Sequence, residues 1–253
     1  MKKIELFGVM FDTLSPEEGA DAIIACAKKH QSALTVTPNG SIVATARRNE
    51  ALFSSLLNAA FAFPDGTSIL WAARRLHTPF PHGRVTGVDL GEEVLRRAAR
   101  EGLSVFFFGG REGVATSAAR ALCMRYPKLT VAGCRSGYFD DLCAVKKELV
   151  KSRADIVFCC LSSPLQETVG RVLADTLSCP VLTLGGSLDI YAGRLRRAPR
   201  VMQAMSLEWL WRCLCEPRRF LKLTPLVRFA FDVLCLKKAK TPCNRAKNRY
   251  NTK

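Results

Sequence analysis

Short apolar runs alternate with longer amphipathic segments along most of the chain. Runs of this length, bounded by glycine, proline or polar residues, are typical of strands. Because they are continuous and do not alternate with polar residues, they fit strands that are covered on both faces, which favours a parallel sheet. We therefore predict an α/β fold, Rossmann-like, with a mostly parallel sheet and helices on both faces. The runs lie at 4–9, 32–36, 60–63, 104–110, 129–134, 154–161 and 179–186.

Helix-start signals stand between several of these runs. Ser15 and Glu18 form an SxxE capping box with a proline at the first helical position, which predicts a helix to about residue 29. Thr86 and Asp89 have the same spacing, and the apolar residues that follow them mark one helical face. Further helices are expected over 40–48, over 51–58 and after the PDG motif at 64–66.

Several apolar runs end in residues that packing does not require. The run LTV is followed by Thr37 and Asn39, and the run AFAF by a proline and Asp65. In sheets of this kind ligands bind outside the carboxyl ends of the strands, so we interpret these two loops as the two lips of one active site. Two later runs end in glycine pairs, where the main chain can approach a ligand closely. These pairs are Gly109 with Gly110 and Gly185 with Gly186.

Each of these motifs also has a purely structural interpretation. Asn39 and Asp65 can be helix N-caps, and Thr37 can be an ordinary strand residue. Gln166 stands at capping-box spacing from Ser163, so it can simply cap its helix. Asp189 can be an acidic residue of a first helical turn, and a glycine pair can be a plain strand-to-helix turn. No single motif decides the function.

Charge divides the chain into two unequal parts. Between Arg194 and Lys253, 16 Lys and Arg residues accompany 3 acidic ones, so +13 of the net charge of +16 lies there. This asymmetry favours a nearly neutral body with a basic end that meets an anion: nucleic acid, membrane phosphate or a phosphate-bearing substrate. We expect an α/β core over 1–199, an amphipathic basic appendage over 200–238 and a disordered basic tail over 239–253.

Cysteine usage and hydropathy indicate in which cellular compartment the protein works. The 11 cysteines are odd in number, form no CxxC motif and lie partly within apolar runs, where cysteine acts as a small hydrophobe. With only 3 histidines a metal site is not expected. We find neither a secretory signal pattern nor an apolar stretch of the roughly 18 residues that a membrane span needs. The sequence therefore predicts a cytoplasmic protein whose membrane contact, if it has one, is peripheral.

In combination the motifs are far more specific than any one of them. Over about residues 4–235 their order closely resembles the WecG/TagA/CpsF family of bacterial glycosyltransferases. The motifs are TPN, PDG, RVTGxDL, FFxGG, GYF, SPxQE, GGSxDxxAGRxxRAP, LEWLWR and EPRR.

The resemblance implies an inverting transferase that uses neither a metal nor another cofactor. Such enzymes transfer a hexose, commonly N-acetylmannosamine or its uronic acid, from a UDP-sugar to a polyprenyl-diphosphate-linked sugar. They work on the inner face of the cell membrane in the synthesis of teichoic acid, common antigen or capsule, and they can form homo-oligomers. The absence of a DxD motif in the chain agrees with transfer that does not depend on a metal ion.

The resemblance also implies a role for individual residues. Asp65 would be the general base, Thr37 and Asn39 would orient a sugar, and Arg84 would meet the diphosphate. Gln166 would bind the sugar or nucleotide. The nucleotide would be bordered by Gly109, Gly110, Gly185 and Gly186, with Asp189 near its ribose or the sugar. In the basic appendage Arg212, Arg218 and Arg219 would hold the lipid diphosphate at an anionic membrane surface.

One motif departs from the family pattern. Members usually read GLGSPKQE where this chain has CLSSPLQE over 160–167, so the lysine is replaced by Leu165. This leaves open whether the donor is N-acetylmannosamine, its uronic acid, glucose or galactose.

Two other classes of protein fit parts of the sequence. A nucleic-acid-binding protein would explain the basic end, but the chain shows none of the usual binding modules, and no nucleic acid is expected as a partner. A dinucleotide-dependent oxidoreductase would carry GxGxxG after its first strand, whereas here the glycines follow a middle one.

Overall fold

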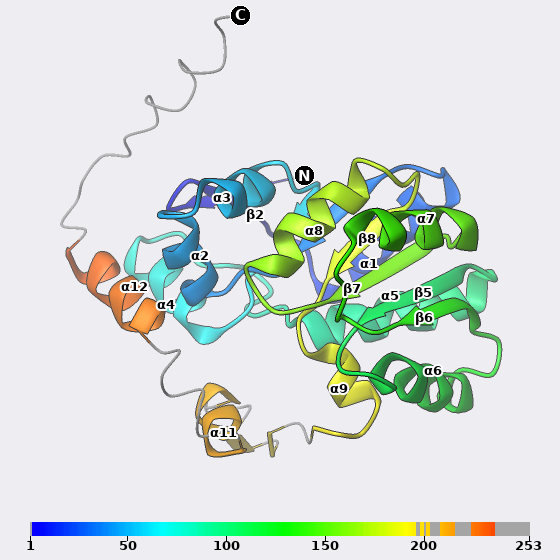
Figure 1. Cartoon of the computed structure of the whole chain (residues 1–253). Helices are drawn as coiled ribbons and strands as arrows, with labels where there is room; N and C mark the ends of the chain where they lie inside the picture. The colour runs from blue at the N-terminus through cyan, green and yellow to red at the C-terminus, as the bar shows by residue number, and fades with distance from the viewer. Residues whose placement is uncertain (1, 196–197, 200, 203–207, 216–223, 236–253) are drawn as a thin grey trace, which may run out of the picture.

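The computed structural model describes residues 2–195, 198–199, 201–202, 208–215 and 224–235 (Figure 1). Its centre is a six-stranded sheet in the order β4-β3-β8-β7-β5-β6, and every neighbouring pair is parallel. This confirms the predicted α/β fold with a parallel sheet. The strands are β3 (Ala33–Val36), β4 (Phe61–Ala62), β5 (Ser104–Gly109), β6 (Thr130–Arg135), β7 (Ile156–Cys160) and β8 (Pro180–Thr183).

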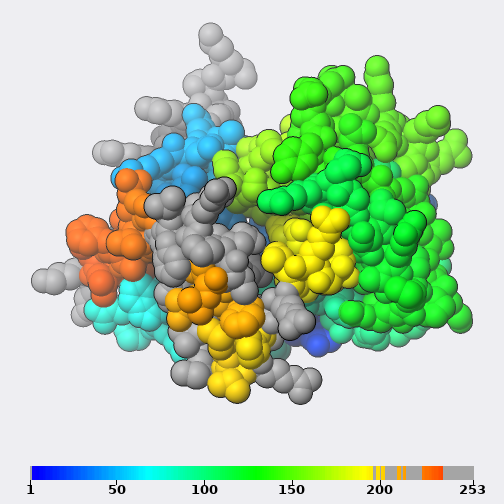
Figure 2. Space-filling view, turned by 60° about the horizontal axis from the view of Figure 1, so that its bottom comes forward, coloured from blue at the N-terminus to red at the C-terminus, as the bar shows by residue number. Residues whose placement is uncertain are grey.

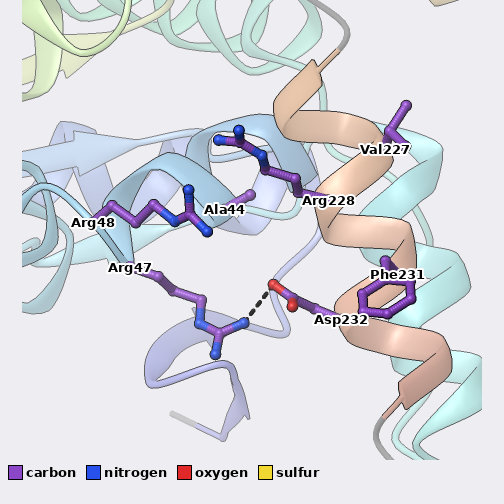
Figure 3. A pocket seen from close by; sticks show the side chains of 7 residues that line it. All are labelled: Ala44, Arg47, Arg48, Val227, Arg228, Phe231 and Asp232. Carbon is purple, nitrogen blue, oxygen red and sulfur yellow. Dashed lines mark hydrogen bonds and ion pairs between the residues drawn. The ribbon is translucent and has the colours of Figure 1, made fainter.

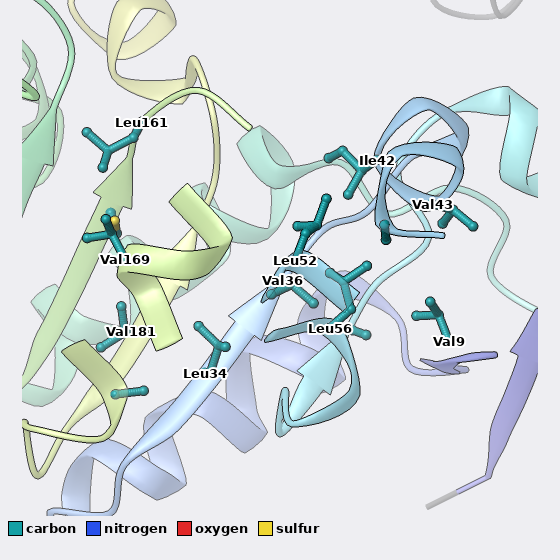
Figure 4. Close-up of a cluster of buried hydrophobic side chains, with 14 of the residues drawn as sticks. Val9, Leu34, Val36, Ile42, Val43, Leu52, Leu56, Leu161, Val169 and Val181 are labelled. Carbon is teal, nitrogen blue, oxygen red and sulfur yellow. The ribbon is translucent and has the colours of Figure 1, made fainter. Parts of the chain in front are cut away.

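Helices cover both faces of the sheet because strand side chains alternate between two separate cores. Phe106 and Phe108 of β5 enter one core, while Val105 and Phe107 enter the other. The first core lies under α2 (Gly40–Ala46), α3 (Glu50–Leu57), α4 (Thr67–Arg75), α7 (Leu142–Ser152) and α8 (Leu165–Ala174), and part of it appears in Figure 4. The second lies under α1 (Pro16–Lys28), α5 (Gly87–Glu101), α6 (Val114–Arg125) and α9 (Ser187–Tyr191).

The N-terminal apolar run differs from its prediction. We expected one strand over 4–9, but the chain reverses at Phe7 and Gly8, which have φ values of 55° and 82°. Two antiparallel strands result, β1 (Lys3–Leu6) and β2 (Val9–Asp12), and they form a sheet of their own. Glycine tolerates positive φ without strain, so Gly8 allows this tight turn. The turn divides the apolar run into two strands.

The hairpin is tied to the main sheet by a buried acid. The Asp12 carboxylate accepts a hydrogen bond from the Ala62 amide of β4 at 2.9 Å. Lys3 lies 3.3 Å from the same carboxylate oxygen and supplies the opposite charge. The contact holds the hairpin beside the edge strand that leads into the PDG motif.

Several predicted helix starts are confirmed. Ser15 accepts from the Glu18 amide and the Glu18 side chain accepts from the Ser15 amide, which completes the capping box of α1. Thr86 accepts from the Asp89 amide at the start of α5. These local motifs form because each side chain satisfies an amide that the first helical turn leaves without a partner.

Two further helices, α11 (Glu208–Cys215) and α12 (Thr224–Cys235), lie within the segment that we assigned to the appendage. Phe229 and Val233 of α12 are buried, and α12 packs beside α2 and α4 (Figures 1 and 2). A side chain at Gly40 of α2 would approach the Phe229 ring to 2.7 Å, so this glycine permits the close contact. Residues 239–253 lie outside the described part of the chain, and the division at 199 stays a prediction. Within the described ranges, each helix is too short or too polar to cross a bilayer.

Candidate active site

The loops after β3 and β4 lie side by side at the carboxyl edge of the sheet. The Phe63 amide donates to the Val36 carbonyl at 2.9 Å, and the Asp65 amide donates to the Pro38 carbonyl at 3.3 Å. The parallel pairing of the strands is thus continued into their loops. The structure therefore brings the TPN and PDG motifs together, as expected for two lips of one site.

The polar side chains of these two loops have different local roles. The Asn39 side chain accepts from the Ile42 amide at 3.1 Å, so Asn39 is the N-cap of α2. The hydroxyl of Thr37 is buried and donates to the Thr183 carbonyl of β8 at 3.4 Å. Asp65 is half-buried. The N-cap position that we weighed for Asp65 is occupied by Gly66, which has no side chain with which to cap α4.

Arg84 belongs to the same side of the site. The amide of the next residue, Val85, donates to the Pro64 carbonyl at 3.0 Å, so the RVTG segment runs along the PDG loop. Arg84 itself is half-buried. Gly87 lies close to the opposite loop, since a side chain there would meet the Thr37 hydroxyl at 3.3 Å. Three segments far apart in the sequence therefore converge around Thr37 and Asp65.

Gln166 connects the ends of β7 and β8. Its Oε1 accepts from the Gly185 amide at 2.8 Å, and its Nε2 donates to Glu167 at 2.8 Å. Gln166 therefore does not form the capping box that its spacing from Ser163 suggested, and Pro164 is the N-cap of α8. The physical reason is competition: the amide of Gly185 attracts the side-chain oxygen that a capping box would need.

Sequence reasoning missed Glu167. This acid is only 1 % exposed, and burial raises its pKa, while its hydrogen bond with Gln166 partly opposes that shift. Two signals pointed to it: its place in the SPxQE motif and its place in the apolar spacing of α8, three residues before Gly170.

The glycine pair after β5 has a demonstrable packing role. Gly109 has φ 142°, and a Cβ atom on it would lie 2.1 Å from the Cys160 carbonyl oxygen of β7. The Gly110 carbonyl accepts from the Gly137 amide at 2.8 Å, which joins the loops after β5 and β6. Gly109 thus permits the close approach of the neighbouring strand end, whereas a side chain at Gly110, which has φ 70°, would meet Val114 of α6 at 2.7 Å. Their proximity to a nucleotide stays a prediction.

The loop after β8 leads directly into α9. Gly185 has a positive φ of 58°, as suits a tight turn, and Asp189 lies in the first turn of α9. The Asp189 carbonyl accepts from the amides of Arg194 and Leu195 at 2.9 and 3.0 Å, which closes the helix end. The Asp189 side chain is half-buried.

Comparison with known proteins agrees with this arrangement. A model of the "Glycosyl transferase WecG/TagA/CpsF family" matches residues 4–244. The chain belongs to this family. It is a glycosyltransferase, and it is 28 % identical over 203 residues to a protein of Bacillus subtilis (strain 168). That relative is named N-acetylglucosaminyldiphosphoundecaprenol N-acetyl-beta-D-mannosaminyltransferase, and the match covers 80 % of this chain and 79 % of the relative.

The arginines expected to hold a lipid diphosphate in this glycosyltransferase fall largely beyond what the structure describes. Arg218 and Arg219 lie outside the described residues. Arg212 belongs to α11, but its side chain is not described. Their roles stay predictions.

Two buried thiols lie near the carboxyl edge of β7 in the transferase. Burial raises the pKa of the Cys160 thiol to about 12 and holds the pKa of Cys159 well above its ordinary value. Both therefore remain neutral at physiological pH, and neither is suited to act as a thiolate nucleophile. In the part of the chain that the structure describes, no group of three His, Cys, Asp or Glu residues is arranged to hold a metal ion.

Proposed function

We propose that the protein is an inverting glycosyltransferase that moves N-acetylmannosamine from a UDP-sugar to a polyprenyl-diphosphate-linked N-acetylglucosamine. Family membership and the name of the Bacillus subtilis relative support the substrate class. The single observation that carries the proposal is the backbone pairing of the TPN and PDG loops at the carboxyl edge of the sheet. The product would serve a cell-surface polysaccharide.

The proposed chemistry follows from the residue types at this edge. The acceptor hydroxyl attacks the anomeric carbon of the donor while Asp65 removes its proton, and the bond from the anomeric carbon to UDP breaks. The negative charge that develops on the departing diphosphate requires a cation, and Arg84 is the candidate because its segment follows the PDG loop. Thr37 and Asn39 are the candidates to orient a sugar, and Gln166 with the glycine loops would border the nucleotide.

The substitution Asp65→Asn tests this assignment directly. The assay measures UDP release with a lipid-diphosphate N-acetylglucosamine acceptor and a panel of UDP-hexoses, which includes N-acetylmannosamine, its uronic acid, glucose and galactose. Loss of a general base is expected to lower turnover by roughly 10²-fold or more, while the variant stays folded because the two side chains have nearly the same size.

Asp175→Asn is the matched control. Asp175 is exposed at the end of α8 and pairs with Arg171, so the same change in charge occurs far from the site. An exposed pair of this kind contributes about 0.2–1 kcal/mol to stability, so this variant should keep its turnover. Equal turnover of the two variants would contradict the role of Asp65. Acceptor-independent turnover, or none with any donor, would contradict the proposed reaction.

The surface around α12 supports a peripheral contact with an anionic membrane. Val227 and Phe231 are each 67 % exposed and stand one helical turn apart. They line a groove of about 510 Å³ between α2 and α12, together with Arg48, Arg228 and the ion pair of Arg47 with Asp232 (Figure 3). Apolar side chains beside arginines are typical of surfaces that meet anionic lipid.

A further inference from the structure

The amide of Gln166 has its orientation fixed from both ends. The Gly185 N–H can only donate, so the atom of Gln166 that faces it must be the oxygen. This orientation turns Nε2 toward Glu167, where a carboxyl oxygen accepts from it. Gln166 is only 4 % exposed, so water cannot readily replace either partner. The two hydrogen bonds therefore depend on each other.

Glu167 is held against the sheet at the level of the strand ends. Gly170, one turn further along α8, would place a Cβ atom 2.6 Å from the Thr183 side chain of β8, so this face of α8 lies close to the sheet. Its second oxygen, Oε2, is buried and has no partner within hydrogen-bond geometry in the described chain, although the nearby Ser163 hydroxyl lowers the pKa of the carboxyl slightly. A buried acid in this state costs stability, and its burial favours the neutral form.

We propose that Glu167 is a positioning residue of the transferase: it accepts from Gln166 and thereby fixes the Gln166 amide, which in turn holds the Gly185 loop beside the end of β7. Glu167 acts in this way as an acceptor, not as a charge. The expected effect on donor binding rests on the proposed function, in which the Gly185 loop borders the nucleotide. Its structural part can be measured without any substrate.

The decisive comparison uses Glu167→Met and Glu167→Gln. Methionine has a similar shape but removes the acceptor, so the buried Nε2 of Gln166 loses its partner. Glutamine keeps an oxygen at the same place and resembles the protonated acid. Hydrogen exchange measured by mass spectrometry on peptides that span 182–188 should show about tenfold faster exchange in Glu167→Met. Glu167→Gln should exchange like the wild type.

The kinetic readout uses the same variants in the UDP-release assay. The donor KM of Glu167→Met should rise by about tenfold, whereas its acceptor KM should not change. Glu167→Gln should restore the donor KM to within about threefold of the wild type. If the wild-type protein transfers no sugar, the proposed function fails, and hydrogen exchange still decides the role of Glu167.

Leu173→Ala is the control for a merely structural effect. Leu173 is fully buried on the same helix, so its truncation lowers Tm without touching the Gln166 hydrogen bonds. Should Glu167→Met fail to fold, Gln166→Met removes the amide itself and must give the same faster exchange at 182–188. The proposal is overturned if Glu167→Met only lowers Tm, as Leu173→Ala does. It is also overturned if Glu167→Gln is as impaired as Glu167→Met.

Discussion

Gly109 offers a test in which the expected loss of stability follows from one close contact. In Gly109→Ala the new methyl group would lie 2.1 Å from the Cys160 carbonyl oxygen and less than 3 Å from the Cys160 Cα and carbonyl carbon. These neighbours are backbone atoms of the adjacent strand β7, so they cannot swing aside as a flexible side chain can. The variant must therefore separate the ends of β5 and β7 or change its backbone angles.

Two contributions determine how much the free energy of unfolding should fall in Gly109→Ala. A residue other than glycine at φ 142° is strained by about 1–3 kcal/mol, and overpacking a well-packed interior costs about 1–3 kcal/mol more. We expect the free energy of unfolding to fall by about 4 kcal/mol, which corresponds to a decrease in Tm of roughly 10 °C for a chain of this size. Gly102→Ala separates the terms, because Gly102 has φ 71° but no atom within 4 Å of its added methyl group. It should cost only about 1 kcal/mol.

The measurement is chemical denaturation of both variants beside the wild type, with Tm from a thermal scan. A loss in Gly109→Ala no larger than in Gly102→Ala would refute the argument, since it would mean that the strand ends do not meet as described. A large loss would show that the glycine of the FFxGG motif is required by packing, whatever the nucleotide adds.

Two further predictions concern Glu167 and the groove beside α12. Burial raises the pKa of Glu167 in the folded protein. Protonation of this acid therefore stabilises the fold fully below its ordinary pKa of about 4.3, and this contribution is lost as pH rises through the raised pKa of the folded state. Glu167→Gln stays neutral, so its free energy of unfolding, measured by denaturation across this range, should rise relative to that of the wild type as pH rises. The thiol of Cys159 stays protonated throughout this range. A constant difference would argue against a buried, neutral acid. In the groove, neither Arg48 nor Arg228 has an acidic partner among the described residues. The double variant Arg48→Ala/Arg228→Ala should therefore bind phosphatidylglycerol vesicles about 2 kcal/mol more weakly, or roughly 30-fold. Arg100→Ala with Arg120→Ala removes the same charge from helices on the other face of the sheet, and an equal loss in that control would exclude the groove as the contact.

Local chemistry in the sequence predicted most of the fold. The capping box at Ser15 uses two side chains and two amides within four residues, and the cap at Thr86 uses one side chain and one amide, so a short motif predicts each of them. The continuous apolar runs likewise predicted strands buried on both faces, as β7 and β8 are, but the edge strand β6 is only half-buried. The N-terminal hairpin was missed because apolar residues flank Gly8 on both sides and the run does not reveal that the chain reverses there.

The candidate site was predictable as a set of strand ends, but not as a set of contacts. Asn39 and Asp65 were identified from their positions after apolar runs, and the pairing of their loops follows from the order of β3 and β4. Gln166 was weighed as a cap because spacing contains only local information. Its true acceptor role depends on Gly185, which is close in space only after β7 and β8 have paired.

The strand order also determines when the site can form during synthesis. Strand β3 is the first strand of the main sheet to be made, yet its neighbour on the inner side of the sheet is β8, which is the last strand to be made. At a synthesis rate of about 5–20 residues per second, β3 has no inner partner for on the order of 10 s. During that interval its buried residues and unpaired amides are exposed as a sheet edge, which is the kind of surface that aggregates. The docking of β8 therefore covers this edge and brings the end of β8 to the candidate site in one late step, and a nascent chain that stalls before residue 180 has neither.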